Sequence, residues 1–98
     1  MEVLKKGDVV EGHRILSELG RGAASIIYLA QDEKSKQIWA VKDVQKTDDK
    51  SVRFLDQAES EYQLAQKLDH PAIRKIVKLV KKKKGLLQTV RLFLMMEF

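Results

Sequence analysis

Three stretches in the first half of the chain are rich in residues that favour β-strands. They are His13 to Leu19, Ser25 to Ala30 and Gln37 to Val44. The short segment Gly20 to Gly22 separates the first two, and glycine allows the backbone angles that a tight reversal needs. A β-hairpin followed by a third strand is therefore predicted.

The third predicted strand carries a charge among apolar neighbours. Successive side chains of a strand point to opposite faces of its sheet, so alternate residues form one row. Lys42 lies in an apolar row, where an uncompensated ammonium group is unfavourable. The two rows are Ile38, Ala40, Lys42 and Val44 on one face, and Trp39, Val41 and Asp43 on the other.

A helix is predicted from about Ser51 to Leu68, because this segment is rich in Ala, Leu, Gln and Glu and contains neither Gly nor Pro. Ser51 is suited to the N-cap, and Pro71 disfavours helical geometry in the residue before it. Glu61 interrupts an apolar stripe on this helix, whereas Glu59 lies off the stripe and its replacement is expected to change little. The stripe consists of Phe54, Ala58, Glu61, Ala65 and Leu68.

Two more strands are predicted at the end of the chain, Ile76 to Lys83 and Thr89 to Phe98, around a turn at Lys84 and Gly85. The last strand is almost continuously apolar, which is typical of a strand buried on both faces. The expected fold is therefore α+β, with a twisted five-stranded antiparallel sheet and one long packed helix. Residues 1–12 form a lead-in, and residues 13–98 form one domain.

The composition is that of a single small globular domain. The chain has 98 residues, 44% hydrophobic and 34% charged, and no apolar run reaches the roughly 20 residues of a membrane-spanning helix. No secretory signal follows Met1, so a cytoplasmic location is expected. Cys is absent and the two histidines, His13 and His70, lie far apart, so no metal site is expected in this chain.

One segment makes the chain basic, with a net charge of +5. Between Arg74 and Arg91 there are eight basic residues and no acidic one, so the rest of the chain is net acidic. We interpret the run Lys81 to Lys84 as a solvated strand end. The alternatives are a docking site and a nucleic-acid contact, and nucleic-acid binding would fall steeply with salt.

Lys42 and Glu61 carry opposite charges at positions that the periodicity assigns to the interior. Because an isolated buried charge is costly, the two side chains are expected to pair. The hairpin Gly20 to Ser25 supplies backbone N–H groups without bulky side chains, as close approach to a polyphosphate requires, and a nearby ammonium group neutralises phosphate oxygens. Together these features indicate a nucleotide site.

These motifs resemble those of protein kinases. Leu19 to Ile27 is similar to the G-x-G-x-x-G-x-V loop, with Ser25 in place of the third glycine, and Ala40-Val41-Lys42 is similar to the V-A-I-K region. Glu61, ahead of Leu68-Asp69-His70-Pro71, looks like the helix glutamate that pairs with that lysine. Residues 13–98 therefore resemble the N-terminal lobe of a eukaryotic-like (Hanks-type) serine/threonine protein kinase, ending at the hinge.

The resemblance implies a role for each matching residue. Lys42 contacts the α and β phosphates of ATP, Glu61 orients Lys42, and Ile27 and Ala40 enclose the adenine. Leu94 to Phe98 looks like the strand that leads to the hinge, and Ala65 and Ile76 match the apolar spine of the lobe. Met96 is the expected gatekeeper, and the Glu97 carbonyl is expected to accept from the adenine amino group. The implied ATP-binding residues are Leu19, Gly20, Arg21, Gly22, Ala23, Ala24, Ser25, Ile27, Ala40, Lys42, Met96 and Glu97.

The implied activity is transfer of a phosphoryl group from Mg-ATP to a serine or threonine hydroxyl of a protein substrate. The magnesium ligands and the catalytic base are expected in the lobe that follows the hinge, so this chain alone is expected to be inactive. Apolar surface around Met95, Met96 and Phe98 is expected to cause self-association. Two alternatives remain: a pseudokinase or regulatory ATP-binding module, and a basic nucleic-acid-binding adaptor, which the motifs disfavour.

Overall fold

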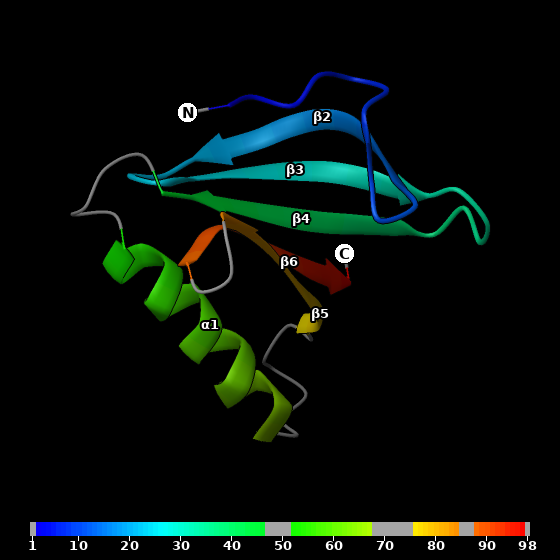
Figure 1. The fold of residues 1–98 in the computed structure, drawn as a ribbon. Coiled ribbons are helices and arrows are strands. Elements are labelled where there is room, and N and C mark those ends of the chain that lie inside the picture. The colour runs from blue at the N-terminus through cyan, green and yellow to red at the C-terminus, as the bar shows by residue number, and fades with distance from the viewer. Residues whose placement is uncertain (1, 47–51, 68–75, 85–87, 98) are drawn as a thin grey trace.

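The structure is a computed structural model that describes residues 2–46, 52–67, 76–84 and 88–97. Six strands and one helix are present in this part of the chain (Figure 1). In chain order they are β1 (Val9–Val10), β2 (His13–Arg21), β3 (Ser25–Asp32), β4 (Ile38–Gln45), α1 (Val52–Lys67), β5 (Ile76–Lys84) and β6 (Gln88–Glu97).

The α+β fold predicted from the sequence is confirmed. The strands form one antiparallel sheet in the order β1-β2-β3-β4-β6-β5, and α1 packs against β4, β5 and β6. The five predicted strands are present, with ends within two residues of those expected. The additional strand β1 is only two residues long, too short to show a periodic pattern. Ser51, Pro71 and Gly85 lie outside the described residues.

Each face of the sheet buries its own cluster of apolar side chains. We call the side on which α1 packs the helix face and the other side the outer face. Buried on the helix face are Val44, Leu55, Ala58, Leu92 and Leu94, with Phe54, Tyr62 and Met96 packed against them. Buried on the outer face are Val10, Ile15, Ile26, Tyr28, Ala30, Val41, Phe93 and Met95, with Leu4 and Trp39 at the margin.

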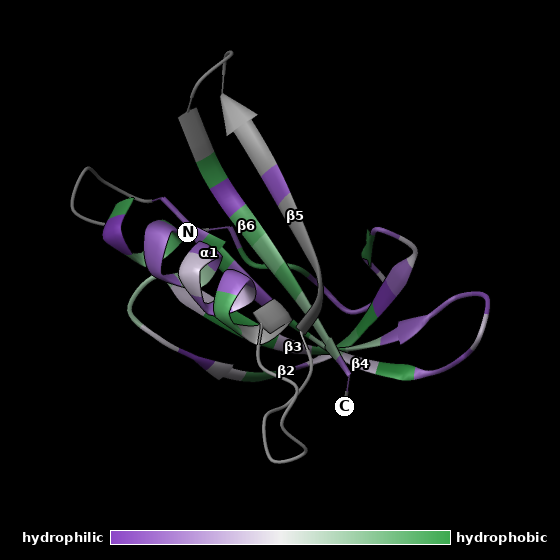
Figure 2. Cartoon of the chain, turned by 90° about the horizontal axis from the view of Figure 1, so that it is seen from below, coloured by the Kyte–Doolittle hydropathy of each residue, from purple (hydrophilic) through white to green (hydrophobic). Residues whose placement is uncertain are grey.

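Strand β6 contributes to both clusters, because its residues from Leu92 to Met95 alternate between the faces and are all buried. Burial on both faces, predicted from the apolar run, is therefore confirmed. Figure 2 shows the hydrophobic stretch of β6 passing α1. The expectation that Met95 is exposed is wrong, since its side chain is fully buried in the outer-face cluster. Phe98 lies outside the described residues.

The lead-in before β2 packs against the sheet. The Gly7 N–H donates to the Ile15 carbonyl and the Ile15 N–H donates to the Asp8 carbonyl, both at 2.8 Å. Gly7 and Gly12 have positive φ angles of 96° and 76°, a conformation that glycine adopts without steric cost. These two glycines let the lead-in reverse direction, so that residues 2–8 return along the outer face.

Candidate nucleotide site

The structure brings Lys42 of β4 and Glu61 of α1 together. The Lys42 Nζ atom lies 3.5 Å from Glu61 Oε2, long for a hydrogen bond but within ion-pair distance. The Lys42 side chain is 28% exposed and that of Glu61 is 41% exposed. The two residues are therefore more exposed than the periodicity predicted, and they lie at the edge of a pocket.

Strand register places the expected nucleotide residues on one face of the sheet. Directly opposed residues on neighbouring strands point to the same side. Ile27 of β3 lies opposite Lys42, and Ala40 of β4 lies opposite Met96 of β6. Gly20 of β2 lies opposite Ile27. These positions line up on the helix face, from the glycine turn to the end of β6.

The turn between β2 and β3 is closed by a hydrogen bond of 2.8 Å from the Gly22 N–H to the Ser25 carbonyl. Neither Gly20 nor Gly22 has a positive φ angle, so the prediction that this reversal needs glycine geometry is wrong. A Cβ atom on Gly20 would meet nothing within 4 Å, whereas one on Gly22 would lie 3.0 Å from Ser25 Oγ. Gly20 therefore leaves open space next to the turn.

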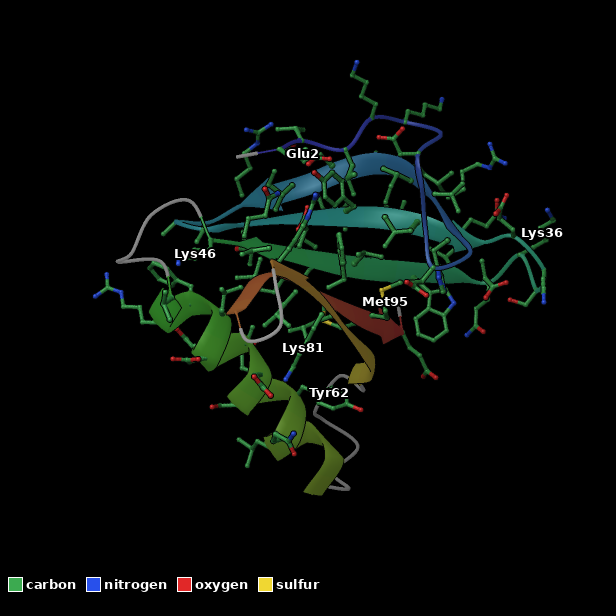
Figure 3. The ribbon with its side chains drawn as sticks, viewed as in Figure 1. Glu2, Lys36, Lys46, Tyr62, Lys81 and Met95 are labelled. Carbon is green, nitrogen blue, oxygen red and sulfur yellow. The ribbon has the colours of Figure 1, made fainter. Side chains whose placement is uncertain are left out.

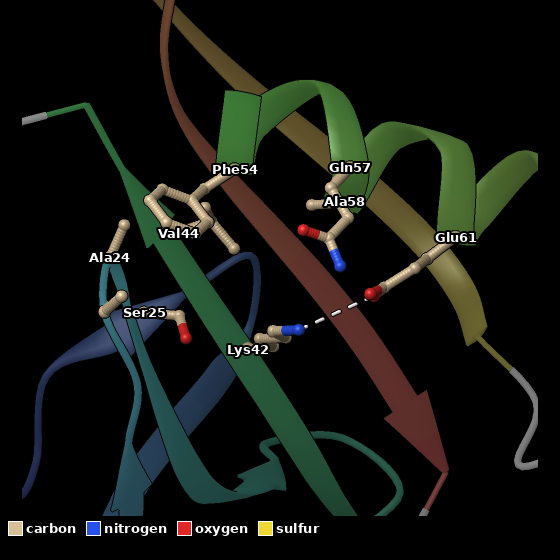
Figure 4. Close-up of a pocket in the computed structure, with 9 residues that line it drawn as sticks. Ala24, Ser25, Lys42, Val44, Phe54, Gln57, Ala58 and Glu61 are labelled. Atoms are coloured by element: carbon tan, nitrogen blue, oxygen red, sulfur yellow. Dashed lines mark hydrogen bonds and ion pairs between the residues drawn. The ribbon is translucent and has the colours of Figure 1, made fainter. Parts of the chain in front are cut away.

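A pocket of about 200 Å³ lies between this turn, β4 and α1. Figure 4 shows the Ser25 hydroxyl, the Lys42 ammonium group and the Gln57 amide converging with the Glu61 carboxylate on one side of it. The other lining residues are small or apolar: Ala23, Ala24, Val44, Phe54 and Ala58. Small residues and a partly exposed cation fit a phosphate group, which needs close approach and charge neutralisation.

Four of the twelve expected ATP-binding residues line this pocket, and the other eight do not: Leu19, Gly20, Arg21, Gly22, Ile27, Ala40, Met96 and Glu97. The Arg21 guanidinium donates to both carboxylate oxygens of Glu18, at 2.7 and 2.9 Å, and this hydrogen bonding lowers the pKa of Glu18. Leu19 is half exposed, and Glu97 is exposed at the end of β6 opposite Trp39. The side chains of Ala65 and Ile76 lie outside the described part of the chain.

Sequence reasoning missed Gln57 as a pocket residue. Gln57 precedes Glu61 by four residues, and residues four apart lie on the same side of a helix. The four-residue spacing therefore predicts that Gln57 lies beside Glu61. A stripe defined by apolar residues does not include a neutral polar residue such as Gln57. Phe54 was recognised as a stripe residue and also forms the apolar wall of the pocket.

Glu59, which the sequence places off the apolar stripe, has a partner on the sheet. Glu59 forms an ion pair with Lys81 of β5, which points toward α1 (Figure 3). The pair ties the helix to a strand that also packs against it. Glu59 is therefore unsuitable as a neutral control for Glu61, and exposed Asp56 on the same helix is the better choice.

Comparison with known proteins identifies the family. The model of the protein kinase domain matches residues 13–98, so this chain belongs to the protein kinase family. A probable myosin light chain kinase of Dictyostelium discoideum is 31% identical over 64 residues, which are 65% of this chain. The match spans 19% of that relative, so the chain corresponds to a minor part of its length. The fold is that of the N-terminal lobe of a protein kinase.

Neither a metal-binding cluster nor a membrane-spanning helix is found in the described part of the chain. No group of three or more His, Asp or Glu residues there could hold a metal ion. No described helix is both long and apolar enough to cross a membrane.

Proposed function

We propose that this chain is the ATP-binding lobe of a serine/threonine protein kinase. The ion pair between Lys42 and Glu61, at the edge of a pocket under the glycine turn, carries this proposal. The periodicity of β4 and α1 predicts that Lys42 and Glu61 face each other, and the fold brings them within ion-pair distance. The pocket beside them suits a phosphate group. Family membership supports the same function.

Each residue of the site has a specific task in this proposal. Lys42 neutralises phosphate oxygens with its ammonium group, and Glu61 holds that group toward the pocket. Ile27 and Ala40 lie on the same face and enclose the adenine, with Met96 limiting the depth behind it. ATP supplies the phosphoryl group that the complete enzyme transfers.

The remaining parts of the reaction belong to the lobe that follows the hinge in protein kinases. That lobe supplies the magnesium ligands and the base that accepts the proton of the protein hydroxyl. We therefore expect the 98-residue chain to bind ATP weakly and to transfer no phosphoryl group. The kinase name of the relative agrees with a protein substrate, and serine or threonine is our proposed acceptor.

The test is phosphorylation of a generic protein substrate by the complete kinase, followed by identification of the phosphorylated amino acid. Lys42→Met should abolish transfer, while Lys34→Met in the exposed β3–β4 turn should leave it unchanged. Phosphotyrosine as the main product would refute the serine/threonine assignment. Nucleotide binding without any transfer would show a regulatory ATP-binding module instead.

A further inference from the structure

The outer face holds a polar site that binds an extended peptide segment, the chain's own residues 2–4. Gln45 of β4 receives both main-chain groups of Glu2: its Oε1 accepts from the Glu2 N–H at 2.9 Å, and its Nε2 donates to the Glu2 carbonyl at 2.6 Å. The Tyr28 hydroxyl accepts from the Leu4 N–H at 2.9 Å. These hydrogen bonds recognise main-chain groups of an extended segment, whatever its side chains are.

Side-chain contacts add selectivity to the same site. The Glu2 carboxylate lies 3.0 Å from the Arg91 guanidinium, and Leu4 packs against the outer-face cluster. Val3 between them is 41% exposed, so the middle position is unconstrained. The bound pattern is therefore an acidic residue, any residue, and then an apolar residue.

Two of the three receptor side chains, Arg91 and Gln45, also have partners within the sheet. Arg91 donates to both oxygens of fully buried Asp43, at 2.9 and 2.7 Å, and lies over the Phe93 ring at 4.9 Å. Gln45 Nε2 also donates to Asp43 Oδ2, at 3.1 Å. With two of its N–H groups fixed by Asp43, Arg91 presents a third group toward the peptide carboxylate. Such preorganisation reduces the entropic cost of binding.

The segment is joined to the sheet by side-chain contacts and not by strand pairing. Residues 2–6 belong to no strand, and the contacts described above join them to the sheet through side chains of β3, β4 and β6. The Glu2 side chain is 68% exposed, and Figure 3 shows Glu2 on the side of the sheet remote from α1. Release of the segment would break none of the strand-to-strand hydrogen bonds.

We propose that Tyr28, Gln45 and Arg91 form a peptide-docking site for extended segments of the pattern acidic–any–apolar, which residues 2–4 occupy in the free chain. The site shares β4 with the nucleotide pocket, since Asp43, which fixes the receptor, follows Lys42 directly. This inference is independent of which substrate the kinase phosphorylates.

The first arm of the test measures amide hydrogen exchange by NMR in the 98-residue chain. In Glu2→Gln, the Leu4 amide should exchange about three to five times faster than in the unmodified chain, because loss of one exposed ion pair favours release of the segment. Amides of β2 to β4 should be unchanged. Lys6→Gln, in the same exposed segment, is the matched control and should leave Leu4 exchange unaltered.

The second arm adds a trans ligand. An acetylated, amidated peptide with the sequence of residues 2–6 is titrated into the Glu2→Gln chain, whose own segment competes less well. We expect resonance shifts at Gln45 and Arg91, weaker shifts with the peptide carrying Gln in the first position, and weaker binding to the Tyr28→Phe chain. Unchanged Leu4 exchange in Glu2→Gln would overturn the proposal. Equal effects of the Glu and Gln peptides, or no shifts at millimolar concentration, would overturn it as well.

Discussion

Lys42 and Asp43 are consecutive residues of β4, and their side chains meet partners of opposite charge on opposite faces of the sheet. Lys42 lies 3.5 Å from Glu61 on the helix face, and Asp43 lies 2.7 Å from Arg91 on the outer face. The two pairs differ in hydration: the Lys42 side chain is 28% exposed, whereas that of Asp43 is 0% exposed. The outer pair is therefore the one expected to carry stability.

Removing Arg91 should destabilise the chain far more than removing Glu61. Arg91→Ala leaves the buried Asp43 carboxylate without its guanidinium partner, and breaking a buried pair in this way costs about 3–5 kcal/mol. Glu61→Ala breaks a partly exposed pair, for which about 1 kcal/mol or less is expected. Denaturant unfolding followed by the fluorescence of Trp39, the single tryptophan, measures both values.

The exposed pair of Arg14 and Glu33, with side chains 52% and 39% exposed, is the control for this comparison. Arg14→Ala removes an arginine of the same size from a hydrated site and should cost about 1 kcal/mol or less. Equal losses for Arg14→Ala and Arg91→Ala would show that burial of Asp43 contributes nothing.

Stability should fall at alkaline pH because of Tyr28. Burial raises the pKa of Tyr28 above its ordinary value of 10.0, and the nearby Asp43 charge acts in the same direction, while the hydrogen bond from Leu4 opposes it. The folded state then holds the proton more tightly than the unfolded state. The contribution of Tyr28 to the free energy of unfolding is fully present below pH 10.0 and is lost as the pH rises through the raised pKa of the folded state.

Tyr28→Phe isolates the effect, since it removes the hydroxyl and little else. The variant should lack this part of the alkaline decline, so the stability difference between the two chains should shrink as the pH rises above 10.0. Unfolding midpoints measured at a series of pH values test this. Parallel curves for both chains would contradict it.

Lys42 and Glu61 should act as one unit in the complete kinase. Glu61→Gln should lower kcat/KM by about 10- to 100-fold by misplacing the ammonium group, and Lys42→Met should lower it further by removing phosphate contact. The double variant should be little worse than Lys42→Met alone, because residues acting together are non-additive. Asp56→Asn on the same helix should leave kcat/KM unchanged. If the losses in kcat/KM of the two single variants were fully additive in the double variant, Lys42 and Glu61 would not act together.

Gly20→Ala should separate nucleotide binding from folding. The added methyl group meets nothing within 4 Å and the φ angle of Gly20 is not positive, so unfolding free energy should change by about 1 kcal/mol or less. The same methyl group occupies the open space next to the turn and should weaken ATP binding by the complete kinase. Thermal unfolding and nucleotide titration check the two halves. Unchanged ATP affinity would argue that Gly20 does not approach the nucleotide.

Periodicity was sufficient for the strands, for α1 and for the meeting of Lys42 with Glu61. It worked there because a charge in an apolar row must find a partner within reach of the same face. The same rule applies to Asp43, which lies in a row with Trp39 and Val41 and therefore also requires a partner of opposite charge. Its partner, Arg91, is distant in sequence and lies in a basic segment, so no local pattern joins the two residues.

The degree of exposure at the nucleotide site could not be predicted from the sequence. A hydrophobic stripe tells which side of a helix faces a sheet, but not where the two surfaces diverge. A pocket between β4 and α1 leaves the side chains of Lys42 and Glu61 partly exposed. Likewise, the contacts of residues 2–4 depend on side chains that are distant in sequence, Tyr28, Gln45 and Arg91, which no local pattern joins.

The strand order has a consequence for synthesis on the ribosome. Because β6 lies between β4 and β5, the hydrogen-bonding edge of β4 has no partner until residues 88–97 have emerged. Until then the nascent chain presents an open, apolar strand edge of the kind that recruits other chains. Cotranslational folding can complete the β2–β4 meander early, yet Lys42 gains its neighbour Leu94 only when β6 has joined the sheet. A ribosome stalled before β6 would therefore display an aggregation-prone intermediate.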